Sequence, residues 1–128
     1  MAARTEAYVD TAALIAFADG SASHHALFRR LFAKPPPLIT TTLVVAEGHG
    51  WFLRRFDPAR ALQFLALVEA MRPLKVAAVG SRERKAATAV LRRFADQSLT
   101  LAYAVGLQLM AARSVRSCWS TDRHMGLT

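Results

Sequence analysis

Cysteine is almost absent from this sequence, since Cys118 is the only one among 128 residues. A lone cysteine excludes a disulfide within the chain and a zinc site built from several cysteines. It precedes Trp119 in a predicted strand and is expected to be buried and inert. No apolar stretch approaches the roughly 18 to 20 residues that cross a bilayer, and residues 1–10 lack the apolar core of a signal peptide. These absences predict a soluble, cytoplasmic protein with no membrane contact.

Acidic residues are also scarce. The chain has 9 Asp and Glu against 17 Lys and Arg, so its formal net charge is +8, and 14 of the 17 basic residues are Arg. The guanidinium group binds phosphate through a planar fork of donors, which favours a polyanionic partner such as RNA. Alternatively, pairs such as Arg29–Arg30 and Arg92–Arg93 are only solvated helix faces, because net charge bears on association and not on fold.

Apolar residues, by contrast, make up 53% of the chain, which excludes an intrinsically disordered protein and allows one domain over residues 1–128. Strands are predicted at Ala7–Val9, Leu38–Thr40, Pro73–Ala77 and Val115–Ser120. Helices are predicted at Thr11–Phe17, His24–Ala33, Thr41 or Thr42 to Phe56, Pro58–Met71, Ser81–Ala95 and Leu99–Arg113. This alternation of short strands with longer helices predicts an α/β domain with a central parallel sheet.

Three acidic residues occupy positions that indicate a metal site. Asp10 and Asp122 each follow a predicted strand, where parallel sheets carry their functional crevice. Glu47 ends the apolar segment Leu43–Glu47, where an inward-facing carboxylate is costly unless it is paired or bound to a metal. Converging carboxylates repel one another by about 1 to 4 kcal/mol per pair at ~4 Å, and a divalent cation removes that penalty.

All-oxygen ligation favours Mg²⁺ or Mn²⁺, and a metal-activated water attacking a phosphodiester is the chemistry that such a site serves. The alternative is that each acid acts alone, as a helix cap or a surface charge. Asp122 would then be a turn residue, and Glu47 would face solvent if its helix were rotated.

Four segments together resemble PIN-domain ribonucleases, most closely the VapC-type toxins of bacterial and archaeal toxin–antitoxin pairs. They are Tyr8–Thr11, Ile39–Glu47 with the following Arg54 and Arg55, Ala95–Ala102 and Ser120–Met125. The resemblance runs in the family's order along nearly the whole chain. It implies a PIN-like three-layer α/β/α fold, with a central parallel sheet flanked by helices, that hydrolyses RNA with Mg²⁺ or Mn²⁺. A small antitoxin protein and a second copy of the chain, in a homodimer, are the implied partners.

Carried over position by position, the resemblance implies that Asp10, Glu47 and Asp122 are catalytic acids and metal ligands. The third acid of the family is missing, because Tyr103 stands where the pattern has aspartate. Asp96, seven residues earlier, matches a frequently acidic position and is the remaining candidate metal ligand. A phenol is a poor ligand for a hard cation near neutral pH, because its reference pKa is about 10.

Two functions therefore stay open. The first is a metal-dependent endoribonuclease, the toxin of a type II toxin–antitoxin system. The second is a catalytically impaired PIN-fold protein that binds RNA or a protein partner without cleaving. A receiver or phosphatase domain phosphorylated on Asp10 is disfavoured, because Val9, Thr11 and Ala12 stand where those proteins carry further acids.

Aromatic and histidine residues are interpreted as structural. Trp51, Phe52 and Phe56 recur at helical spacing, which is typical of a core-facing helix and not of a base-stacking platform. His24 and His25 are adjacent, so their side chains diverge on a helix, and a role at the helix start is expected.

Overall fold

Four short strands form a parallel sheet in the computed structural model, which describes residues 5–121. They are β1 (Ala7–Val9), β2 (Leu38–Thr41), β3 (Leu74–Ala77) and β4 (Ser117–Trp119), in the order β3-β2-β1-β4. The central strand β1 pairs on both sides, with Tyr8 opposite Ile39 of β2 and Cys118 of β4. Because the pairs are parallel, the carboxyl ends of the strands share one edge of the sheet.

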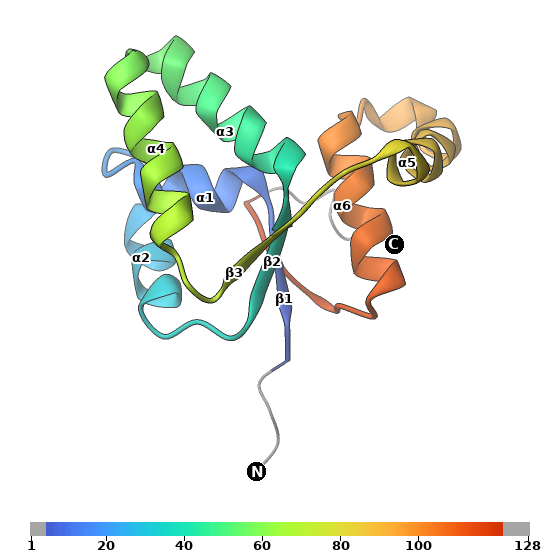
Figure 1. The fold of residues 1–128 in the computed structure, drawn as a ribbon, viewed down its shortest axis with the longest axis horizontal. Helices are drawn as coiled ribbons and strands as arrows, with labels where there is room; N and C mark the ends of the chain where they lie inside the picture. The colour runs from blue at the N-terminus through green and yellow to red at the C-terminus, as the bar shows by residue number, and fades with distance from the viewer. Residues whose placement is uncertain (1–4, 122–128) are drawn as a thin grey trace.

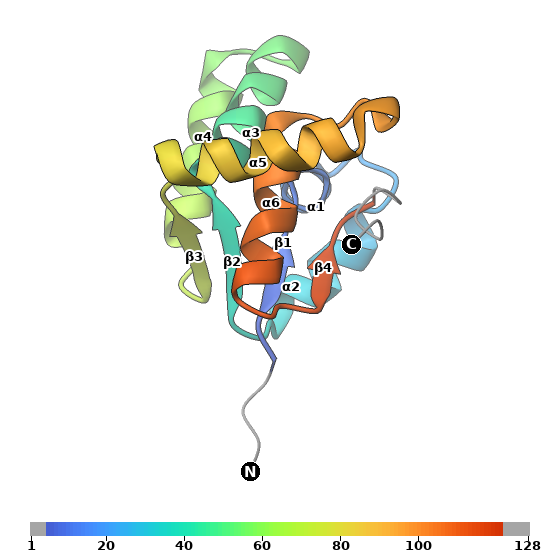
Figure 2. The ribbon, with the colours of Figure 1, turned by 90° about the vertical axis from the view of Figure 1, so that its right-hand side faces the viewer.

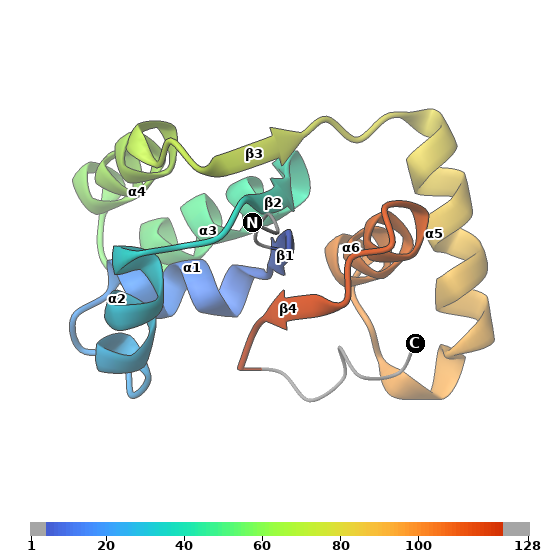
Figure 3. The same ribbon diagram turned by 90° about the horizontal axis from the view of Figure 1, so that it is seen from below.

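Helices cover both faces of this sheet (Figure 1). One layer contains α1 (Thr11–Ala18), α2 (His25–Ala33), α3 (Thr42–Arg55) and α4 (Pro58–Ala70). The other contains α5 (Ser81–Arg93) and α6 (Leu101–Ala112), and the view from below shows the sheet between the two layers (Figure 3). The predicted three-layer α/β/α architecture with a central parallel sheet is thus confirmed.

Side-chain caps explain where three of the helices begin. The side-chain oxygens of Thr41, Asp57 and Thr100 each accept the backbone N–H of the residue three positions on, at the starts of α3, α4 and α6. Pro58 follows Asp57 at the first position of α4, where a missing N–H costs nothing. The predicted starts of α3 and α4 are therefore confirmed, whereas α6 begins two residues later than expected.

The segment between α5 and α6 differs from the prediction. The helix expected to reach Ala95 ends at Arg93, and a short 3₁₀ helix, η1 (Ala95–Gln97), follows it. Ser98 then adopts a left-handed conformation with φ of 54°, which redirects the chain into α6. None of the helices within residues 5–121 combines the length and the apolar character needed for a bilayer crossing.

The two faces of the sheet are packed in different ways. On the side of α3 and α4, aromatic rings fill the core, and Phe52 stacks on Phe64 with ring centroids 5.2 Å apart. On the side of α6, the helix approaches β1 closely at Gly106. A Cβ added at Gly106 would lie 2.5 Å from the hydroxyl oxygen of Tyr8, so only glycine leaves room for that ring.

Candidate active site

Asp10 lies at the carboxyl edge of the sheet, between β1 and α1, and is only 8% exposed. Its backbone N–H donates to the carbonyl oxygen of Trp119 at 3.0 Å. The hydroxyl of Ser120 donates to its Oδ2 at 2.9 Å. Both partners belong to the end of β4, because β4 pairs with β1 in parallel. The position predicted for Asp10, directly after a strand, is confirmed.

Glu47 approaches the same edge from α3. Its Oε1 accepts a hydrogen bond of 2.8 Å from the hydroxyl of Thr11, the residue that follows Asp10. A carboxylate from α3 is thus hydrogen-bonded to the residue next to Asp10, so both acids lie at the same edge of the sheet. Neither the Thr11 nor the Ser120 contact was predicted from the sequence, although Ser120 belongs to the segment that carries the resemblance.

Of the two orientations left open for Glu47, the structure shows the one that faces solvent. The buried stripe of α3 consists of Val44, Gly48 and Phe52, and Glu47 lies off this stripe on the exposed side. An exposed carboxylate keeps its hydration and needs no compensating charge. Glu47 is therefore free to face a ligand that comes from solvent.

Tyr103 stands in the first turn of α6 and is 8% exposed. Helix α6 leads into β4 at the amino edge of the sheet, so its own N-terminus lies at the carboxyl edge (Figure 2). Tyr103 precedes Gly106 by three residues, and Gly106 packs against Tyr8, two residues before Asp10. The departure from the family pattern therefore lies in the first turn of α6, at the carboxyl edge of the sheet.

The two remaining predicted acids are placed differently. Asp96 is exposed on η1, where its Oδ2 accepts a hydrogen bond of 3.1 Å from the side chain of Gln97. Asp122 lies outside the described residues. Within residues 5–121, no group of three or more His, Cys, Asp or Glu side chains is arranged to hold a metal. The described donors at the edge are carboxylate and hydroxyl oxygens, which suit a hard cation such as Mg²⁺ or Mn²⁺.

Two neighbours of Asp10 are kept protonated. Burial raises the pKa of the Cys118 thiol to about 12, with a contribution from the negative charge of Asp10. Burial and the same charge also raise the pKa of the Tyr8 phenol well above its ordinary value. Neither group supplies an anion near neutral pH, which agrees with the prediction of an inert Cys118, although the residue is partly and not fully buried.

The core role predicted for the aromatic residues around α3 is confirmed for Phe52, which is buried, and Trp51 is partly buried. It is wrong for Phe56, which follows the last residue of α3 and is 36% exposed. The ring of Phe56 stacks on Phe52 at 5.9 Å, and the guanidinium of Arg60 lies over Phe56 at 4.2 Å. At the start of α2, a ring nitrogen of His25 lies 2.9 Å from the carbonyl oxygen of Ala16 and links α2 to α1.

The chain forms a parallel sheet between two layers of helices, with acidic residues at the carboxyl edge of the sheet. This arrangement is the PIN fold of VapC-type proteins. A solved structure with the same fold is VapC20 of Mycobacterium tuberculosis, described as a sarcin–ricin loop cleaving toxin. Its chain is 20% identical to this one, with a TM-score of 0.86, and the match covers 94% of this chain and 93% of that chain. No protein-family model and no curated protein matches the sequence.

Proposed function

We propose that this protein is a metal-dependent endoribonuclease, the toxin of a type II toxin–antitoxin system. The observation that supports the proposal is that Asp10 and Glu47 lie at the same carboxyl edge of a PIN fold, Glu47 hydrogen-bonded to Thr11 next to Asp10, and Asp10 to Ser120. Mg²⁺ or Mn²⁺ is the proposed cofactor. Asp10, Glu47 and Asp122 are its proposed ligands, with Asp96 as a further candidate.

The chain's own residues orient the two carboxylates. Ser120 and the backbone of Trp119 fix Asp10, and Thr11 fixes the Oε1 oxygen of Glu47. When bound, a divalent cation supplies an activated water and neutralises charge on the phosphodiester. Asp10, which is buried, and Glu47, which is exposed, would hold such a cation at the boundary between the core and solvent.

The partners and location follow from the same proposal. RNA is the substrate, and the formal charge of +8 favours its binding. A small antitoxin protein would neutralise the activity, the chain would form a homodimer, and the protein would act in the cytoplasm. Because VapC20 is described as cleaving the sarcin–ricin loop, a hairpin RNA with that loop is the first substrate to test.

Tyr103 favours a second function, a PIN-fold protein that binds RNA or a protein partner without cleaving. This residue occupies the first turn of α6, at the carboxyl edge of the sheet, and brings a phenol in place of a carboxylate. With one charge fewer than the family pattern, the centre would hold a divalent cation weakly.

A labelled hairpin RNA separates the two functions. The first predicts cleavage with Mn²⁺ that stops in EDTA and falls by about 100-fold or more in Asp10→Asn and Glu47→Gln. Binding should persist in both variants and weaken steeply between about 50 and 200 mM salt, because counterions are released for each phosphate contacted. Binding without cleavage by the unaltered protein would support the second function. Cleavage that survives EDTA, or a flat salt dependence, would contradict the proposal.

A further inference from the structure

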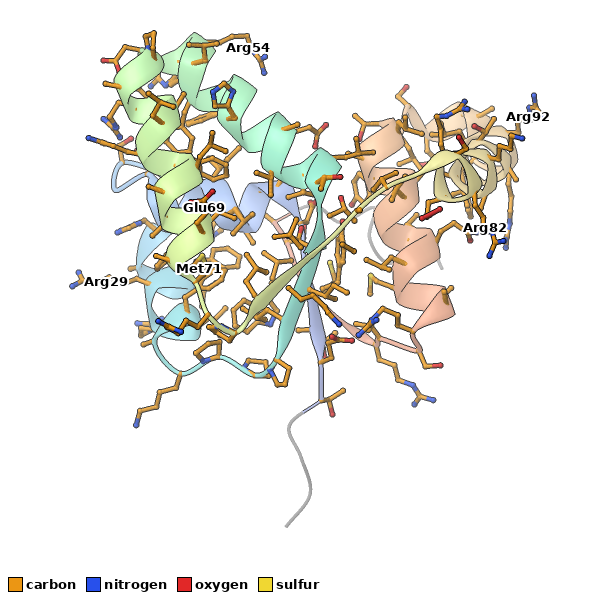
Figure 4. All side chains as sticks on the ribbon, in the orientation of Figure 1. Arg29, Arg54, Glu69, Met71, Arg82 and Arg92 are labelled. Carbon is orange, nitrogen blue, oxygen red and sulfur yellow. The ribbon has the colours of Figure 1, made fainter. Side chains whose placement is uncertain are left out.

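One face of α3 extends the candidate site away from the sheet. Glu47, Gly50 and Arg54 are three and seven residues apart, so they follow one another along the same side of the helix. The Cα atoms of Glu47 and Arg54 are separated by about 10 Å along the helix axis. Arg54 projects from the end of α3 that is farther from the sheet (Figure 4).

The side chain of Arg54 turns back along this face. A Cβ added at Gly50 would lie 3.1 Å from Nη1 of Arg54, so the guanidinium group rests against the glycine backbone. Helical side chains lean toward the N-terminus of their helix, and Gly50 leaves the space for this one to lie close. The positive charge of Arg54 is thereby directed toward Glu47.

The neighbouring arginines have other contacts. Arg55 and Arg60 lie over the ring of Phe56 at 5.7 and 4.2 Å, and the charge of each lowers the pKa of Asp19. Arg54, by contrast, is exposed and pairs with no carboxylate within residues 5–121. Its donors are available to a ligand from solvent.

We infer that Arg54 is an RNA-positioning residue that binds a phosphate flanking the one at Asp10 and Glu47. This inference rests on the proposed ribonuclease function and adds to it a second contact along the RNA backbone. A guanidinium group binds a phosphate by donating two parallel hydrogen bonds to its oxygens. Helix α3 would then set the register of the strand, with Glu47 at the reacting phosphate and Arg54 at a neighbour.

The first test compares Arg54→Ala with Arg55→Ala, which removes the same charge from the next position. Binding of the hairpin RNA is measured by fluorescence anisotropy at several salt concentrations. Arg54→Ala should weaken binding by about tenfold and make the slope of log K against log salt shallower by about 0.7 to 0.9, the value for one lost phosphate contact. Arg55→Ala should leave the slope close to that of the unaltered protein.

The second test moves the guanidinium group without removing it. In Gly50→Ala, the added methyl group would require Nη1 of Arg54 to move by a few tenths of an ångström, while alanine favours the helical backbone. We expect Tm to stay level or rise while RNA affinity falls by less than in Arg54→Ala, and the double variant should bind no more weakly than Arg54→Ala alone. If the unaltered protein binds the RNA and Arg54→Ala matches Arg55→Ala, this inference is overturned and the proposed function stands. If the unaltered protein binds no RNA at all, both fail.

Discussion

Helices α3 and α6 flank the candidate site from opposite faces of the sheet, and they are buried to very different extents. Of the 14 residues of α3, Val44, Gly48 and Phe52 are buried. In α6, 7 of the 12 residues are buried, because the sheet lies on one side and α5 on the other (Figure 2). A charge on α3 can stay hydrated, whereas a charge on the core face of α6 needs a compensating ion.

Replacing Tyr103 with aspartate, which puts a charge on the buried helix, should have the largest effect on stability. A carboxylate in the buried first turn of α6 loses its hydration, so Tyr103→Asp should lower the free energy of unfolding by about 3 kcal/mol or more in EDTA near pH 7. Mn²⁺ should recover much of the loss, because binding to the folded state alone stabilises it. Thermal unfolding with and without Mn²⁺ measures both effects.

Tyr103→Phe is the control, since it keeps the ring and removes only the hydroxyl group. Its midpoint should respond to Mn²⁺ no more than that of the unaltered protein. An equal Mn²⁺ response in Tyr103→Asp and Tyr103→Phe would show that position 103 does not face the metal site.

The glycines of the two helices give a second, smaller contrast. Gly106→Ala would press a methyl group against the buried ring of Tyr8 and should cost about 1 to 3 kcal/mol of stability. The hydroxyl of Tyr8 is the atom nearest to that methyl group. In a Tyr8→Phe background, the cost of Gly106→Ala should therefore fall by roughly 1 kcal/mol in a double-mutant cycle.

Gly48→Ala is the matched control on α3, because its methyl group would meet Phe64 and not Tyr8. Tyr8→Phe should leave its cost unchanged, as measured by urea unfolding. Equal rescue of both glycine variants would mean that Tyr8→Phe acts on overall stability and not on the contact with α6.

The smallest effect is expected at Asp19, on the α3 side of the sheet. Burial alone would raise its pKa, but two hydrogen bonds from Ser21 and the charges of Arg60 and Arg55 hold the pKa below its ordinary value of 3.8. The carboxylate therefore stabilises the fold above that value, and its contribution is lost as the pH falls through the lower folded pKa. Asp19→Asn should cost about 0.5 to 1 kcal/mol at pH 7.

Urea unfolding of Asp19→Asn and the unaltered protein at pH 7 and at acid pH checks this sign. The two stabilities should converge in acid, where the charge of Asp19 is gone. A difference that grows as the pH falls would contradict the assignment.

Local chemistry in the sequence was enough to place most of the fold. The Asp57–Pro58 pair predicted the start of α4, and an apolar run ending at Asp10 predicted both β1 and the edge of the sheet. The 3₁₀ helix after Arg93 was not predictable in this way, since its left-handed residue is Ser98 and no glycine marks the turn.

The candidate site was less accessible to sequence reasoning, because its contacts are remote in the chain. Thr11 and Glu47 are 36 residues apart in the sequence. Position 106 has room only for glycine because it packs against the ring of Tyr8, which is also far away in the sequence. The apolar segment before Glu47 left the rotation of α3 ambiguous, and only the packing of Phe52 against Phe64 resolves it. The sequence was enough to select Asp10 and Glu47 as candidate site residues. Their hydrogen-bond partners could be identified only from the three-dimensional structure.

The hydrogen bond between Ser120 and Asp10 joins residues 110 positions apart. Ribosomes make proteins from the N-terminus, so Asp10, Thr11 and Glu47 emerge long before the strand that orients Asp10. Pairing between such distant segments also forms slowly, because a large loop must close first. The carboxylate at the centre of the candidate site therefore gains its hydrogen bond from Ser120 only after about 110 further residues have been made.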